Sequence, residues 1–138
     1  MYCKGLSKQE LVDAGIVGVV YLPELDEWQI HRYWYKGSSK IKVNSQIKIT
    51  LAKGPHKYRP DKFYPKVSFS CRTGQKGKRI SYNIPLSRLI YTWFIKDIPD
   101  GYVIDHIDNN SYNCLPNNLQ MLTVEQNLAK RFEDNPEA

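Results

Sequence analysis

The side chains best suited to chemistry lie together in the stretch YVIDHIDNNSYNCLPNNLQMLTVEQN, which runs from Tyr102 to Asn127. This stretch holds one histidine, two aspartates and six asparagines between short apolar runs. An unperturbed imidazole titrates at about pH 6.5, roughly where a general base that activates water should titrate. A carboxylate combined with an amide oxygen forms a sparse, all-oxygen ligand set, which suits Mg²⁺ or Mn²⁺.

Local patterns predict the elements that position these groups. GYVIDHIDNN indicates a strand that runs into a turn, and strand alternation places Asp105 on one face and His106 on the other. LQMLT predicts a second strand. Thr123 and Gln126 match a capping box, which predicts that VEQNLAKRF is a helix. The expected order is therefore strand, long loop, strand and helix.

The loop between the two strands is rich in asparagine. A polar loop needs side chains that satisfy its own backbone, and Asn does this well. Several of its polar residues are therefore expected to form turns rather than to bind a ligand: Asp108, Asn109, Asn110 and Asn113. Cys114 is expected to be an ordinary loop residue.

The combination of these residues resembles the HNH endonucleases, whose nuclease core is a ββα-metal motif. The matching residues are Asp105 and His106, Asn118 twelve residues after the histidine, and Asn127 nine residues further on. DHIDNN and PNNLQMLTVEQN are most similar to the HNH enzymes of phages, including homing nickases. The resemblance covers roughly residues 66–131. It does not clearly cover the first sixty residues, which are interpreted from composition alone.

The resemblance implies a role for each matched residue. His106 matches the catalytic general base, and Asp105 matches a metal ligand. Asn118 matches the central asparagine of the motif, which pins the loop and so helps to orient the catalytic histidine. Asn127 matches the last motif position as a second metal ligand. Many members have histidine there, but the phage nickases resemble this chain in having asparagine. The implied cofactor is Mg²⁺ or Mn²⁺.

The resemblance implies metal-dependent cleavage of DNA, and the chemistry of the residues agrees with it. Phosphodiester hydrolysis needs an activated water and a positive charge for the leaving oxygen. One metal and one histidine cut one strand, so a monomer is expected to nick, and a double-strand break is expected to require a homodimer or two visits. The alternative is a non-catalytic nucleic-acid-binding module that keeps the fold. The intact set of Asp105, His106 and Asn127 favours the enzyme.

The rest of the chain predicts an α+β fold. SKQELVDAG indicates a short helix; IVGVVYL and EWQIHRYWYKG indicate strands, and SKIKVNSQIKITLAKG indicates two strands around Asn44 and Ser45. GPHKYRPDKFYP is expected to be a loop, and KVSFSCRTGQKGKRISYNIPL a hairpin. PLSRLIYTWFIKDIP predicts a helix with Trp93 and Phe94 in the core. Residues 1–83 should form a mainly antiparallel, DNA-contacting region, and residues 84–138 a helix and the ββα-metal core.

Positive charge is concentrated in the middle of the chain. The net charge is +6, and the segment from Lys53 to Arg79 holds nine Lys or Arg residues against the single acid Asp61. Such a segment with interleaved aromatic residues suggests a polyanion such as DNA as partner. The residues expected to meet phosphates lie at or near the hairpin tip: Arg72, Lys76, Lys78 and Arg79. Alternatively, these cations only blunt exposed strand edges.

Composition narrows the setting of the protein. No run of 18 apolar residues exists, so no membrane partner is expected, and the N-terminal residues lack an apolar signal core. The three cysteines are widely spaced without a CxxC pair, and the three histidines are scattered, so no structural zinc is expected. The protein should therefore be intracellular, and the resemblance places it in the cytoplasm of a phage's bacterial host.

Overall fold

The computed structural model describes residues 4–35, 42–53, 63–72 and 79–134, which form two compact units. One unit is Gln9–Leu86, and the other joins Met1–Lys8 to Ser87–Ala138. Helices and antiparallel strands are both present, which confirms the expected α+β class. The functional division expected between residues 83 and 84 stays a prediction. None of the helices in the described ranges has the length and apolar character needed to cross a bilayer.

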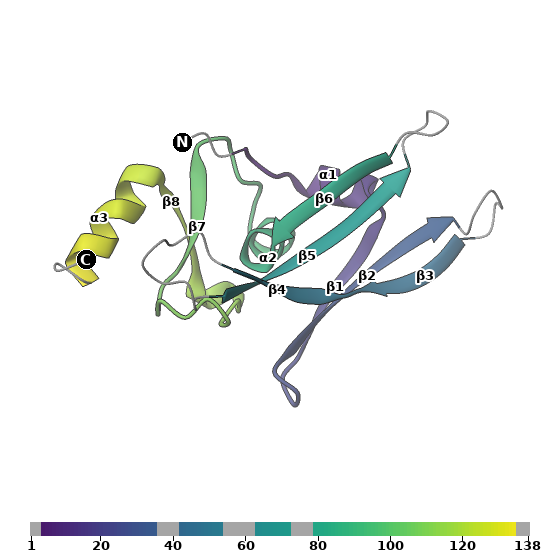
Figure 1. Cartoon of the computed structure of the whole chain (residues 1–138), viewed down its shortest axis with the longest axis horizontal. Coiled ribbons are helices and arrows are strands. Elements are labelled where there is room, and N and C mark those ends of the chain that lie inside the picture. The colour runs from purple at the N-terminus through teal and green to yellow at the C-terminus, as the bar shows by residue number, and fades with distance from the viewer. Residues whose placement is uncertain (1–3, 36–41, 54–62, 73–78, 135–138) are drawn as a thin grey trace. The chain divides into compact units, whose positions relative to one another are not determined.

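The first unit, Gln9–Leu86, contains two three-stranded antiparallel sheets (Figure 1). The short helix α1 (Lys8–Asp13) precedes the first sheet, which comprises β1 (Ile16–Leu22), β2 (Glu27–Tyr35) and β3 (Lys42–Ile47). The second sheet comprises β4 (Ile49–Lys53), β5 (Phe63–Arg72) and β6 (Arg79–Pro85). The Arg32 guanidinium of β2 donates to the backbone oxygen of Ser70 in β5 at 2.8 Å, so a hydrogen bond links the two sheets.

The chain passes from one sheet to the other at Lys48, and this corrects the expected break at Asn44 and Ser45. Ile47 still pairs with Ile30 in the first sheet, whereas Ile49 already pairs with Val67 in the second. The alternation of apolar residues continues across this point, so the sequence pattern alone does not mark it.

The predicted hairpin of β5 and β6 is confirmed. Val67 lies opposite Ile84, and Phe69 lies opposite Tyr82 with the two ring centroids 5.1 Å apart. The strand begins at Phe63, earlier than expected, and so includes Pro65. This proline pairs only with Leu51 of β4, since the pairing with β6 starts at Lys66. A proline without a backbone N–H is tolerated where one side of a strand is unpaired.

The tip of this hairpin carries the residues predicted to contact DNA. Arg72 and Arg79 pair through their backbones at the end of the ladder, but their side chains are outside what the structure describes. Lys76 and Lys78 fall entirely outside the described residues. Their expected role in DNA binding therefore stays a prediction.

The second unit contains the ββα core that the sequence predicted (Figure 1). Its elements are α2 (Leu86–Phe94), β7 (Tyr102–His106), the 3₁₀ turn η1 (Pro116–Asn118), β8 (Leu119–Thr123) and α3 (Val124–Asp134). Leu89 and Ile90 of α2 are fully buried, as expected of an anchoring helix. The expectation that Phe94 packs in the core is wrong, because 48% of this residue is exposed. Trp93 is half-buried, and the Lys8 ammonium lies 4.7 Å from its ring centroid.

The N-terminal segment belongs to this second unit although it is distant in sequence. Leu6 and Ile98 form a backbone bridge, and the Gly5 N–H donates to Asp100 Oδ1 at 2.6 Å. The Arg88 guanidinium donates to the backbone oxygens of Lys4 at 2.6 Å and of Tyr102 at 3.0 Å. One side chain of α2 thus joins the N-terminal segment to the start of β7.

Replacing Gly5 with alanine should destabilise the protein by about 1–3 kcal/mol. A Cβ at Gly5 would collide with the backbone oxygen of Ile98 and lie 2.9 Å from the Asp100 nitrogen, and backbone cannot easily move away. Gly18→Ala is the matched control, because a Cβ there meets nothing within 4 Å. Thermal denaturation followed by circular dichroism measures both. A Gly5→Ala protein as stable as the Gly18→Ala protein would contradict the tight approach of residue 5.

Candidate functional site

The hairpin of β7 and β8 carries the predicted metal ligand, Asp105, and the predicted base, His106. The two residues are consecutive in sequence but lie on different faces of the strand. Asp105 lies opposite Gln120, and His106, the last residue of β7, lies opposite Leu119. The Gln120 amide donates to Asp105 Oδ2 at 2.8 Å. His106 Nε2 instead lies 3.7 Å from the Cys114 sulfur in the following loop. The two neighbouring residues therefore have separate surroundings, as strand alternation predicts.

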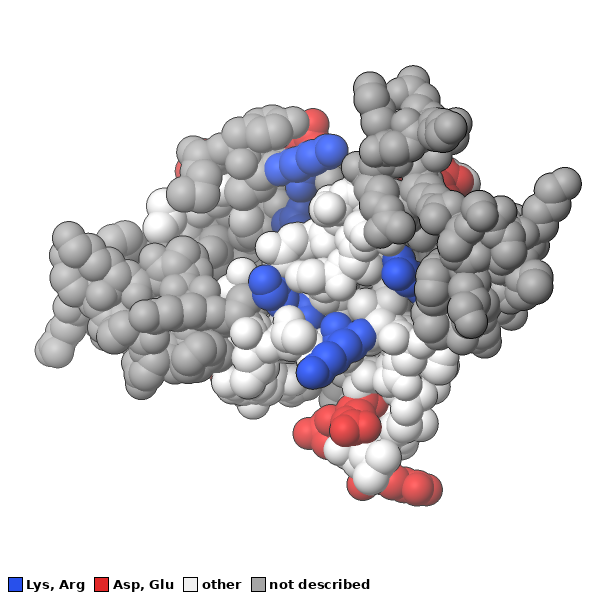
Figure 2. Space-filling model, turned by 45° about the vertical axis from the view of Figure 1, so that its right-hand side comes forward, with Lys and Arg blue, Asp and Glu red and all other residues white. Residues whose placement is uncertain are grey.

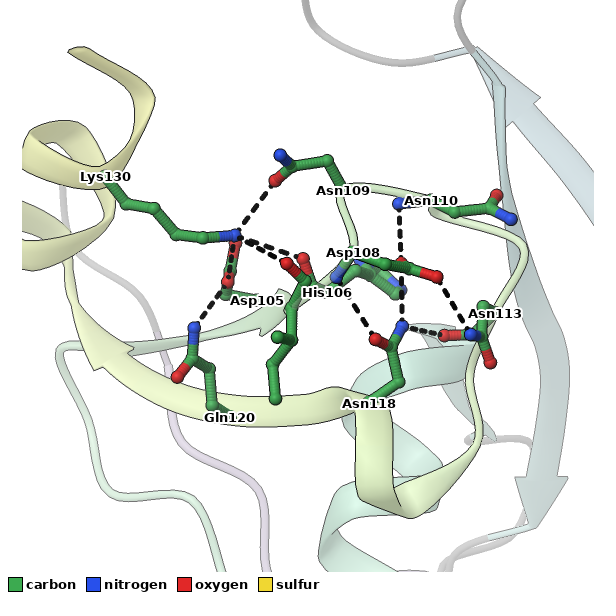
Figure 3. A network of polar contacts seen from close by, with 10 residues as sticks. Asp105, His106, Asp108, Asn109, Asn110, Asn113, Asn118, Gln120 and Lys130 are labelled. Atoms are coloured by element: carbon green, nitrogen blue, oxygen red, sulfur yellow. Dashed lines mark hydrogen bonds and ion pairs between the residues drawn. The ribbon is translucent and has the colours of Figure 1, made fainter. Parts of the chain in front are cut away.

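Asn118 closes the loop between the two strands through its side-chain amide (Figure 3). It is only 8% exposed. Its Oδ1 accepts from the backbone N–H of Asp108 at 3.1 Å, and its Nδ2 donates to Asp108 Oδ1 at 2.9 Å and to the Asn113 backbone oxygen at 2.8 Å. The backbone N–H of Ile107, the residue after His106, donates to the Asn118 backbone oxygen at 2.8 Å. Asn118 thus holds the segment that follows the histidine, while its catalytic importance stays a prediction.

Asp108 is occupied by the loop itself. Its carboxylate accepts from the Asn113 side chain, the Asn110 backbone N–H and the Asn118 side chain, each at 2.9 Å. These hydrogen bonds, led by that from Asn113, hold the pKa of Asp108 below its usual 3.8. The nearby charge of His106 adds to this lowering, and desolvation opposes it. The expectation that Asp108 and its asparagine neighbours form turns is consistent with these contacts.

Cys114 lies against the imidazole, a contact that no sequence pattern predicts. Its side chain is 1% exposed, and burial raises the pKa of the thiol to about 12. The thiol is therefore neutral at pH 7. Its sulfur lies 3.5 Å from the Ser111 backbone oxygen as well as 3.7 Å from His106 Nε2. Cys114 is thus a neutral packing partner of the predicted base and more than an ordinary loop residue.

The helix α3 brings a cation to Asp105. The predicted capping box is confirmed, since the Thr123 N–H donates to Gln126 Oε1 at 2.9 Å and the Gln126 N–H donates to Thr123 Oγ1 at 3.1 Å. This cap sets the start of the helix. Lys130, two turns along, forms an ion pair with Asp105 Oδ2 at 2.8 Å (Figure 3). Sequence reasoning missed Lys130, because the motif that carries the resemblance specifies only Asn127 on this helix.

The side-chain types of Asp105 and Asn127 are chemically compatible with a hard divalent cation. Asn127 is half-buried in α3 and precedes Lys130 by three residues, so the two share one side of the helix. The Lys130 ammonium is itself a positive charge held at the Asp105 carboxylate, which shows that this position attracts a cation. Carboxylate and amide oxygens are the ligands that Mg²⁺ and Mn²⁺ accept. The pair of Asp105 and Asn127 as metal ligands stays a prediction.

Replacing Asn118 with alanine should lower the free energy of unfolding by about 2–3 kcal/mol, because it removes three part-buried hydrogen bonds. Asn117→Ala is the matched control, since Asn117 is the exposed neighbour in η1. Urea unfolding measures both variants. Equal loss of stability in the two proteins would show that the buried amide does not hold the loop.

Replacing Asn113 with alanine should raise the pKa of Asp108 towards 3.8, because it removes the largest cause of the lowering. Since the folded-state pKa is depressed, the stability that the ionised carboxylate contributes is present above pH 3.8 and is lost as the pH falls through the folded-state pKa. Carbon-13 NMR titration of the Asp108 carboxyl measures the shift. Asn117→Ala should leave that titration unchanged, and an unchanged titration in Asn113→Ala would refute the assignment.

Comparisons with known proteins agree with this arrangement. The model of the HNH endonuclease family matches residues 85–129. A protein of Bacillus subtilis named as a prophage-derived HNH homing endonuclease is 38% identical over 50 residues, which cover 36% of this chain and 29% of that protein. An uncharacterized HNH endonuclease of Acanthamoeba polyphaga mimivirus is 40% identical over 58 residues, which cover 39% of this chain and 31% of that protein.

The chain thus matches less than a third of the length of either relative. No solved structure matches it significantly. The matched segment holds Asp105, His106, Asn118 and Asn127, and it ends one residue before Lys130. Residues 85–129 of this chain are therefore similar to the HNH endonuclease family.

Proposed function

We propose that the protein is an endonuclease that hydrolyses phosphodiester bonds of DNA with the help of one divalent metal ion. The observation that carries this proposal is the placement of Asp105 and His106 at the end of β7, next to the loop that Asn118 holds and to the helix α3. Because Asp105 and His106 are consecutive residues, one strand end would hold both the proposed cation ligand and the proposed base, on its two faces.

The residues have distinct tasks in this proposal. His106 takes a proton from the attacking water, and its ring is braced from one side by the buried Cys114. Asp105 and Asn127 would hold Mg²⁺ or Mn²⁺. When bound, the metal supplies positive charge to the scissile phosphate and the leaving oxygen. Asn118 keeps the residue after the base in place through the Ile107 backbone.

Contact with DNA rests on charge in this proposal. The segment from Lys53 to Arg79 carries nine basic residues, and Arg72, Lys76, Lys78 and Arg79 are its candidates for phosphate contacts. On the face drawn in Figure 2, the described basic side chains are scattered among uncharged ones, whereas acidic side chains gather at its lower end. The turn between β1 and β2 in the first sheet carries exposed acidic residues, among them Glu24 and Asp26. Because acidic side chains repel phosphate, this turn is the part of the first sheet least suited to DNA.

A single base and a single metal cleave one strand. A monomer would therefore nick DNA, and a homodimer would be needed to break both strands in one event. The similarity to a prophage-derived protein supports a phage origin, and we propose that the enzyme acts in the cytoplasm of the bacterial host.

The wild-type protein should convert supercoiled plasmid to open circles with Mg²⁺ or Mn²⁺ and leave it intact with EDTA. His106→Ala should lower the single-turnover rate about 10²–10⁴-fold, the usual cost of removing a general base. Its affinity for DNA, measured by gel shift, should stay close to wild type because lysine and arginine carry binding.

His31→Ala serves as the matched control, because His31 belongs to β2 in the first unit, where its ring contacts Gln29. Nicking by His106→Ala at the wild-type rate would refute the base assignment. DNA binding without cleavage by the wild-type protein would instead favour a non-catalytic binding module.

A further inference from the structure

The Lys130 ammonium lies within a shell of four oxygen atoms (Figure 3). Asp105 Oδ2 is 2.8 Å from Nζ and Asn109 Oδ1 is 2.9 Å from it. The backbone oxygens of His106 and Ile107 are 3.2 and 3.4 Å away. An ammonium has three protons, so it cannot make a separate hydrogen bond to each of four oxygens. The shell therefore surrounds a positive charge in the way that ligands surround a metal ion.

The strand end and the turn after it build this shell. Asn109 adopts a left-handed backbone conformation, with φ 62°, which asparagine tolerates better than most residues. Its backbone N–H donates to the His106 oxygen at 2.9 Å, which closes the turn. The Asn118 amide holds the next residues of the loop through Asp108. Because these contacts hold the turn independently of those from Lys130, its oxygens should stay in place when the ammonium leaves.

The lysine can leave without unfolding the helix. Its side chain is 20% exposed and has a flexible four-carbon stem, whereas the Asp105 side chain is 12% exposed and also held by Gln120. Mg²⁺ binds a carboxylate oxygen at about 2.0–2.1 Å. An ammonium and a divalent ion on the same oxygen would repel each other strongly at such separations. Lys130 and the metal should therefore compete for Asp105 Oδ2.

We propose that Lys130 is a tethered cation that occupies the Asp105 site until a divalent metal displaces it, an inference that rests on the metal site of the proposed function. In the metal-free protein the ammonium neutralises the Asp105 carboxylate. It also raises the metal concentration at which the site fills. If Lys130 occupies the oxygen for about nine-tenths of the time, the apparent metal affinity falls about tenfold.

Calorimetric titration with MnCl₂ of metal-free protein tests this competition. Lys130→Met keeps the length of the side chain and removes the charge, and it should bind Mn²⁺ about tenfold more tightly than wild type. Lys96→Met is the matched control, because Lys96 is an exposed lysine of the same unit. It changes the net charge equally, so its Mn²⁺ affinity should change by less than about twofold.

A second measurement needs no variant. Acetylation of wild-type lysines, followed by mass spectrometry, should modify Lys130 faster in Mg²⁺ than in EDTA, because the metal releases its ammonium. Lys96 should react equally in both. A lysine that only stabilises the helix would keep its contact with Asp105, and its reactivity would not change.

The outcomes separate this inference from the proposed function. Lys130→Met could bind Mn²⁺ no more tightly than wild type, and Lys130 of the wild-type protein could be acetylated at the same rate with and without Mg²⁺. These two results together would refute the displacement but not the metal site. No Mn²⁺ binding by any of the three proteins would overturn the metal site, and the displacement with it. Binding by Lys130→Met alone would support the displacement in its strongest form.

Discussion

The buried amide of Asn118 is the interaction on which the rest of the second unit depends. The loop from Ile107 to Asn118 is polar, and a chain of this kind leaves many backbone groups that need partners. One side chain contacts both the beginning and the middle of that loop, through Asp108 and Asn113. The end of β7 is consequently fixed, and with it the carboxylate and the imidazole that the proposed chemistry requires.

The two aspartates near this amide have opposite surroundings. The Asp108 carboxylate accepts hydrogen bonds from two neutral side-chain amides and one backbone N–H, and these bonds hold the loop. Asp105 accepts from one neutral amide and one cation. The Asp105 carboxylate already binds one cation, so it is suited to exchanging that cation for another. The Asp108 carboxylate is bound by three neutral donors of the loop and is not suited to such an exchange. Three residues in sequence therefore separate the carboxylate that holds the loop from the one that is proposed to bind a metal.

Sequence reasoning succeeded where local rules decide the structure. The capping box of α3, the hairpin of β5 and β6 and the turn-forming asparagines depend on residues close in the chain. It failed where distant packing decides. The strand break at Lys48 depends on which sheet each side joins, and the exposure of Phe94 depends on how α2 is covered. Cys114 contacts His106, and Lys130 contacts Asp105. Each pair joins residues of different elements, so no local sequence pattern predicts these contacts.

The division of the chain has a consequence for synthesis on the ribosome. The second unit uses Met1–Lys8 and Ser87–Ala138, and the two sheets lie between these segments in sequence. The bridge between Leu6 and Ile98 and the Arg88 contact with Lys4 cannot form until the later segment has emerged. The sheets can therefore complete their pairing first, while the site on β7 waits for almost the whole chain. During translation the two sheets can thus form before the proposed cleavage site, which forms last.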